Sequence, residues 1–120
     1  MISPTQRTLL HLRRHGALAA TVERWNAFVV RPGGGRGVRM DLWRFADIIA
    51  VDDQPGVLFI QACRTDDMAT RETKMRSEKV WPNIERVLAA KNRVRLVGWA
   101  KRGEQKRWTM SAREITCATR

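Results

Sequence analysis

The sequence has no tyrosine, only two cysteines, and about half as many acidic as basic residues. Cys63 and Cys117 lie far apart, so they do not form the disulfide framework of a small secreted domain. No apolar run reaches the 18 residues that a membrane span needs. The N-terminus lacks the apolar segment of a secretion signal. These absences predict a cytoplasmic protein in a reducing compartment, with no membrane contact.

The charge that is present has one dominant sign. Lys and Arg number 23 against 12 Asp and Glu, which gives a net charge of +11. Such an excess favours a polyanionic partner, most often nucleic acid. A ribosome-like accessory protein and an ordinary basic domain remain alternatives. The 120 residues, 43% of them hydrophobic, suit a single domain over 1–120.

Local signals predict an α/β fold with a mixed sheet flanked by helices. Ser3, Pro4 and Gln6 begin a helix that ends at Gly16, through a capping box and a C-terminal glycine. A last strand leaves a short tail at 114–120. In the order αβββαα(β)β, the expected strands are 20–25, 45–51, 57–63, 93–98 and 106–113, and the later helices are 66–80 and 82–91.

The two central strands carry the candidate chemistry. The turn 52–56 joins strands 45–51 and 57–63 into a hairpin, which predicts that Asp47 and Gln61 lie on one sheet face. Gln61 and Cys63 point the same way because side chains alternate along a strand. Oxygen donors converging from neighbouring strands are typical of a Mg²⁺ site.

The succession of motifs resembles the PD-(D/E)xK nuclease superfamily, and within it the archaeal-type Holliday junction resolvases. It is also similar to a group of phage and prophage proteins. The matching stretches are Thr5–Gly16, Val22–Asn26, Asp41–Ala50, Phe59–Cys63 and Asn92–Trp99.

The resemblance implies a restriction-endonuclease-like fold and an activity on DNA, branched or four-way. It implies Mg²⁺ or Mn²⁺ as cofactor, with Asp47, Gln61 and the Ala62 carbonyl as ligands. It also implies a homodimer, because a four-way junction has two-fold symmetry. The expected location is the nucleoid or a phage-infected cell.

The sequence departs from the nuclease pattern at two points. Cys63 occupies the position of the family lysine, and the acid of the first helix is absent, with Gln6 the nearest polar match. Glu23 is a replacement acid, and Lys74 is the first candidate for the missing cation. The predicted catalytic residues are therefore Asp47, Gln61, Glu23 and Lys74. The predicted metal ligands are Asp47, Gln61 and Ala62.

Two basic segments are candidates for DNA contacts. The glycine-rich loop 31–39 is expected to be flexible and to bind phosphate, with an ordinary hairpin tip as the alternative. The charged segment after the motif strand would flank the site, unless it is only a solvated helix face. The predicted DNA-binding residues are Arg31, Arg36, Arg39, Arg64, Arg71, Arg76 and Lys79.

Three functions are consistent with these features. The first is a DNA-binding protein with a resolvase-like fold, acting as a Mg²⁺-dependent, structure-selective endonuclease. The second is the same fold without catalysis, as a DNA- or protein-binding module. The third is an RNA-binding accessory protein.

Overall fold

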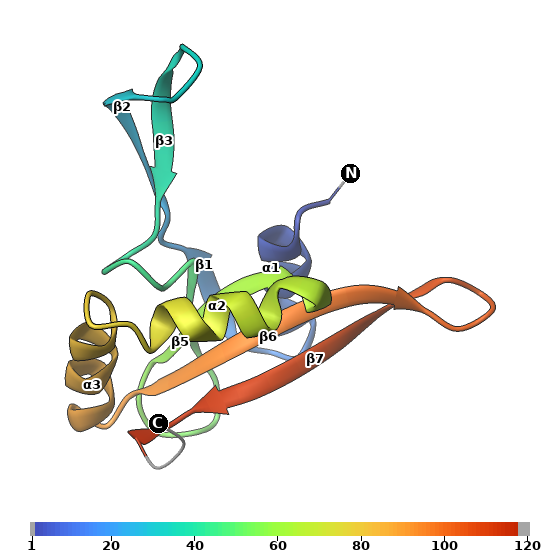
Figure 1. Ribbon diagram of the computed structural model, residues 1–120. Coiled ribbons are helices and arrows are strands. Elements are labelled where there is room, and N and C mark those ends of the chain that lie inside the picture. The colour runs from blue at the N-terminus through green and yellow to red at the C-terminus, as the bar shows by residue number, and fades with distance from the viewer. Residues whose placement is uncertain (1, 118–120) are drawn as a thin grey trace.

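The computed structural model describes residues 2–117. Two helices follow the fifth strand and two strands follow the helices (Figure 1). The elements in chain order are α1 (Pro4–Arg14), β1 (Leu18–Thr21), β2 (Arg24–Val30), β3 (Arg36–Met40), β4 (Ile48–Val51), β5 (Leu58–Arg64), a 3₁₀ turn η1 (Thr65–Asp67), α2 (Met68–Met75), α3 (Trp81–Ala89), β6 (Arg93–Arg102) and β7 (Arg107–Ile115).

The body of the protein is a five-stranded mixed sheet in the order β1-β4-β5-β6-β7. Only the central pair β5 and β6 is parallel; the other neighbours are antiparallel. Helix α1 packs on one face, where Leu12 meets Ile48 and Ile60. Helices α2 and α3 cover the other face, where Met75 and Ile84 join a second buried cluster. The predicted α/β class is confirmed.

The start of α1 follows from its sequence. The Ser3 hydroxyl oxygen accepts a hydrogen bond from the Gln6 amide at 3.2 Å, and Pro4 occupies the first turn. The helix ends beside His15, and Gly16 takes a positive φ of 85°. The predicted helix is confirmed in position and in its Ser3 cap, which is the half of the capping box that the structure shows.

The strand predicted at 20–25 is wrong as a single element. The chain breaks at Val22 and Glu23, because β1 pairs with β4 whereas β2 leaves the sheet to pair with β3. The strand β3 was not expected, since 31–39 reads as a glycine-rich loop. The predicted order of elements therefore lacks two strands before α2.

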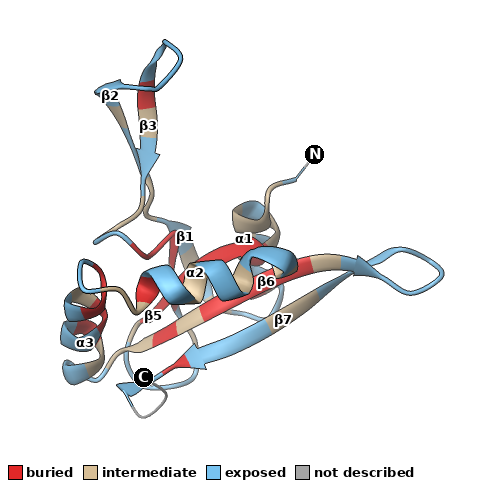
Figure 2. Cartoon of the chain, viewed as in Figure 1, coloured by how far each residue is buried: buried red, intermediate tan, exposed pale blue. Residues whose placement is uncertain are grey.

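Strands β2 and β3 form an arm that projects from the body (Figure 1). Most of the arm is exposed (Figure 2), and Phe28 in β2 is 89% exposed. Gly37 has a φ of 98° and lies directly against the indole of Trp25, where any Cβ would clash. The arm is a two-stranded ribbon, so the flexible loop predicted at 31–39 is only its turn and the strand that follows.

Several boundaries also differ from expectation. The strand predicted at 45–51 begins only at Ile48, so Asp47 precedes β4. Helix α2 ends at Met75 rather than at 80, and Trp81 begins α3 because proline is tolerated in the first turn of a helix. Strand β7 reaches Ile115, so the predicted tail at 114–120 begins too early, and its last three residues lie outside the described range. None of the helices within 2–117 is long and apolar enough to cross a membrane.

Candidate metal centre

The centre is built on the connection between β3 and β4. Leu42 and Ala46 exchange backbone hydrogen bonds of 2.8 and 3.0 Å, which folds residues 41–47 back on themselves. Trp43 and Arg44 close this turn with φ values of 51° and 71°. Such positive φ values are unfavourable for bulky residues and cluster at functional sites. The fold-back brings Asp41 beside Asp47.

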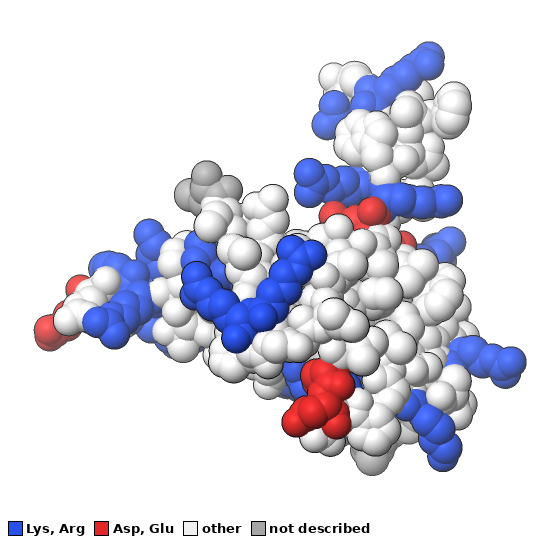
Figure 3. Space-filling model, turned by 180° about the vertical axis from the view of Figure 1, so that it is seen from behind, with Lys and Arg blue, Asp and Glu red and all other residues white. Residues whose placement is uncertain are grey.

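Three carboxylates converge at this point. Each of Glu23, Asp41 and Asp47 offers an oxygen, and these oxygens lie within 4.8 Å of one another. Glu23 enters from the break between β1 and β2, where Val22 donates its backbone N–H to the Asp47 carbonyl at 2.9 Å. Acidic atoms appear at the root of the arm in Figure 3, bordered by Lys and Arg. This acid triad could hold a metal ion, because Mg²⁺ and Ca²⁺ prefer carboxylate oxygens.

Gln61 lies opposite Asp47 on the same sheet face, as its position predicts. Its side-chain amide donates to Asp47 at 3.0 Å and to Asp41 at 3.3 Å. Both Gln61 and Asp47 are 3% exposed. Gln61 therefore presents its N–H₂ to the acids, and its oxygen would face a bound cation only after the amide turns by 180°.

Ala62 contacts Asp47 through its backbone. Its N–H donates to the Asp47 carboxylate at 2.8 Å. The N–H and C=O of one strand residue point to the same edge. The Ala62 carbonyl is thus on the side of β5 that faces Asp47, although the hydrogen bond itself uses the amide.

Asp47 is held in its neutral form while no cation is present. Burial, the Asp41 carboxyl group and the nearby charge of Glu23 raise the pKa of Asp47 to about 9, against the opposing effect of the Ala62 N–H. Like charges packed together out of water behave in this way. A divalent ion would have to displace this proton, so metal binding should release a proton at neutral pH.

Cys63 does not supply a positive charge. It is 4% exposed within the cluster beneath α2 and α3, and burial raises the pKa of its thiol to about 11. A neutral thiol behaves as a small apolar side chain. Cys63 therefore fills the core beside the centre.

Basic side chains approach the acid triad from the arm and from α2. Arg39 lies 3.8 Å from Glu23. A groove of about 530 Å³ runs past Asp41, and Lys74 and Lys79 line it together with Arg39 and Arg44. Within 2–117 the Lys74 ammonium makes no ion pair or hydrogen bond. Lys74 thus borders the centre without touching the carboxylates.

The other predicted DNA contacts are scattered. Arg31 and Arg36 lie on the arm, and Arg64 ends β5 in a separate groove. Arg71 is on α2, where its charge acts on Cys63. Arg76 lies 2.9 Å from Glu72 and over the Trp81 ring. Arg76 therefore packs against Glu72 and Trp81, and its contact with DNA stays a prediction.

Asp41 is a candidate metal ligand that the sequence analysis did not predict. It was part of a stretch matching the nuclease pattern, but no role was given to it. The available signal was a second aspartate six residues before Asp47, across a short segment with no glycine. The fold-back between them is what makes them neighbours, and only the positive φ values of Trp43 and Arg44 reveal it.

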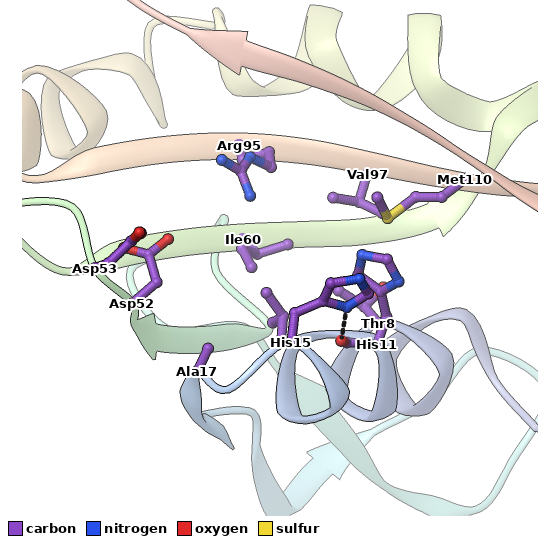
Figure 4. Close-up of a pocket in the computed structure, with 11 residues that line it drawn as sticks. Thr8, His11, His15, Ala17, Asp52, Asp53, Ile60, Arg95, Val97 and Met110 are labelled. Carbon is purple, nitrogen blue, oxygen red and sulfur yellow. Dashed lines mark hydrogen bonds between the residues drawn. The ribbon is translucent and has the colours of Figure 1, made fainter.

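A different pocket lies on the α1 face of the sheet (Figure 4). The rings of His11 and His15 are 4.4 Å apart there, with Arg95 above them and Asp52 at the far end. Burial and the neighbouring His15 lower the pKa of His11. Across residues 2–117, the acid triad is the only group of three His, Cys, Asp or Glu with metal-ligand spacing, so the histidine pair lacks a third ligand.

No protein-family model, no curated protein and no solved structure matches the chain. The roles of these residues are therefore inferred from the geometry of the site alone.

Proposed function

We propose that the protein binds DNA and cleaves it with a divalent ion held by Glu23, Asp41 and Asp47. The observation that carries this proposal is the convergence of three carboxylates within 4.8 Å in a chain of net charge +11. Three acids at one point would repel phosphate unless a cation lies between them. A bridging cation turns the same cluster into a phosphate-binding site.

The donor set fits Mg²⁺ or Mn²⁺ better than the sequence alone implied. The predicted pair Asp47 and Gln61 supplies one negative charge to a cation, because Gln61 is neutral. The three carboxylates of the triad supply three negative charges. Hard cations of this kind bind carboxylates and keep several waters. When bound, the ion would polarise a phosphoryl oxygen and lower the pKa of a coordinated water.

The protein's own groups have separate tasks in this proposal. Gln61 and the Ala62 N–H orient Asp47 through hydrogen bonds of 3.0 and 2.8 Å. Arg39, 3.8 Å from Glu23, and Lys74 in the adjoining groove would hold the DNA phosphate. The arm supplies further phosphate contacts through Arg31 and Arg36. The resemblance to resolvases supports branched DNA as the substrate and a homodimer as the active form.

The second candidate is a catalytically inactive DNA-binding module of the same fold. Cys63 favours it, because its buried neutral thiol stands where the nucleases carry a lysine. Lys74 would have to take over that role. The two candidates differ in cleavage and agree on DNA binding.

The test combines metal binding with cleavage. Wild-type protein and Asp47→Asn are titrated with Mn²⁺ by calorimetry, then incubated with duplex, single-stranded and four-way DNA in Mg²⁺ or Mn²⁺. We expect Asp47→Asn to lose Mn²⁺ binding and cleavage and to keep its affinity for DNA in EDTA. Cleavage that survives in Asp47→Asn would refute the site. DNA binding with no cleavage by the wild type would select the second candidate.

A further inference from the structure

A second basic groove lies between the start of α1 and the β6–β7 hairpin. It measures about 810 Å³ and has a tryptophan on the hairpin side. We call it the Trp108 groove. Its lining residues with chemical significance are Arg7, Arg64, Asp66, Lys101, Arg102 and Trp108.

The groove presents one accessible aromatic ring. Trp99 is buried and donates its indole N–H to the Thr8 hydroxyl at 2.9 Å, so it is part of the core. Trp108 is 38% exposed. The Arg7 guanidinium carbon lies 4.1 Å from the centroid of the Trp108 ring, and the Lys101 ammonium nitrogen lies 5.4 Å from it. The ring quadrupole holds these cations over the indole, so a flat ligand would stack on the part of the ring that stays exposed.

The charge of the groove is strongly positive. Its four basic side chains face a single acid, Asp66. Among the described residues, none of the four takes part in an ion pair. Positive charge that no protein acid neutralises, combined with an accessible indole, favours a ligand that carries both phosphates and bases. An apolar peptide would use the ring but not the charges.

The groove adjoins the metal centre at the first turn of α1. Pro4 lines the groove, and the hydroxyl of the next residue, Thr5, donates to Glu23 at 3.5 Å. Arg64 lies three residues beyond Gln61 on β5, so its side chain points to the opposite face of the sheet. A nucleic-acid strand that contacts both places therefore runs around the first turn of α1, where Thr5 meets Glu23.

We propose that the Trp108 groove binds an unpaired segment of the nucleic acid whose duplex part lies at the acid triad. A base stacks against Trp108, and Arg7, Arg64 and Arg102 hold the flanking phosphates. A paired base cannot reach the indole, because its faces are covered by neighbouring base pairs. Stacking of this kind tolerates any base sequence. The inference rests on the DNA-binding part of the proposed function and specifies a junction or tail as the preferred substrate.

The test compares two DNA ligands that differ in one feature. A labelled blunt duplex and the same duplex with a single-stranded tail of thymidines are titrated by fluorescence anisotropy in EDTA. We expect the wild type to prefer the tailed DNA. Trp108→Ala should reduce that preference about tenfold, since stacking on an aromatic side chain is of this size. Trp108→Phe, which keeps a ring, should retain most of it.

The affinity for blunt duplex serves as the internal control and should stay unchanged in both variants. If Trp108→Ala lowers binding to both DNAs because it unfolds, Arg7→Gln decides, because it keeps the indole and removes the cation above it. An Arg7→Gln protein with full tail preference would overturn the inference.

The outcomes separate this inference from the proposed function. Equal binding of blunt and tailed DNA by the wild type refutes the Trp108 groove and leaves the duplex-binding proposal intact. Failure to bind either DNA at low salt refutes both. Tail preference without any metal-dependent cleavage supports the groove and rejects the nuclease proposal alone.

Discussion

The acid triad and the β2–β3 arm lie next to each other and differ in every physical respect. In the triad Asp47 is 3% exposed and Glu23 and Asp41 are half-buried, and the three acids concentrate negative charge. The arm is mostly exposed and carries Arg24, Arg31, Arg36 and Arg39 with no acid between 24 and 40. Metal binding at the triad would therefore depend on the exact placement of a few atoms. DNA binding by the arm would depend on the number of its charges.

The two regions also differ in what holds them. The triad rests on the five-stranded sheet and on a strained turn at Trp43 and Arg44. The arm is a separate two-stranded sheet, and such a ribbon has little stability of its own. The relative positions of the three carboxylates depend on the whole fold. The charge of the arm does not depend on its conformation.

The largest expected effect comes from Asp41, which sequence reasoning did not assign. Asp41→Asn removes one of three carboxylates and should lower the cleavage rate by about 100-fold or more, since several kcal/mol of charge stabilisation are lost. Single-turnover cleavage at saturating Mg²⁺ measures it. Asp53→Asn, an exposed aspartate beyond the other end of β4, is the matched control. Equal rates in the two variants would remove Asp41 from the centre.

A smaller effect is expected on the arm. Replacing Arg31 and Arg36 together with alanine should lower the slope of log affinity against log salt by about two units, one for each lost phosphate contact. The control is Arg14→Ala with Lys91→Ala, which removes the same charge from the ends of α1 and α3. Identical slopes for the two double variants would mean that only net charge matters and that the arm has no special role.

The smallest effect concerns stability, and it opposes the effect on cleavage. The folded-state pKa of Asp47, about 9, lies above the ordinary value of 3.8. The folded protein thus keeps a proton that the unfolded chain releases, and this contribution to stability is lost as the pH rises from about 4 to about 9. Asp47→Asn removes that loss and should stabilise the protein by about 1–2 kcal/mol at pH 8.

Urea denaturation in EDTA at pH 5, 6.5 and 8 measures this difference. The advantage of Asp47→Asn over the wild type should grow from the lowest to the highest pH. A constant difference would show that Asp47 does not carry the proton. Mn²⁺ should stabilise the wild type at pH 8 and leave Asp47→Asn unchanged, because only the wild type binds the ion.

Local signals predicted the parts of the fold that depend on neighbours in the chain. The cap at Ser3 and Pro4 and the alternation around Asp47 and Gln61 gave α1 and the pairing of β4 with β5. Glu23 was expected to reach the site, and it lies within the triad. The first two features need only residues a few positions apart, or strands joined by a short turn. Glu23 lies far from Asp47 in the sequence, so its place in the triad depends on tertiary contacts.

Tertiary structure decided the remainder. The sequence around Val22 and Glu23 contains no turn signal that would predict two strands. The break arises because β1 pairs with β4 whereas β2 pairs with β3. The role of Gly98 also depends on tertiary contacts. Gly98 lies against Met68 and Thr65, and because it has no Cβ, η1 and α2 can approach β6 closely. That approach fixes where Lys74 lies relative to Asp41.

The charge, the first helix, the central hairpin and the pairing of Asp47 with Gln61 follow from the amino-acid sequence alone. These depend on composition and on regular periods, which a chain carries whatever its partners. The acid triad, the arm and the Trp108 groove were decided by the tertiary structure. Each joins residues from segments far apart in sequence, and the contact between such segments follows from sheet order and packing, which no local pattern encodes.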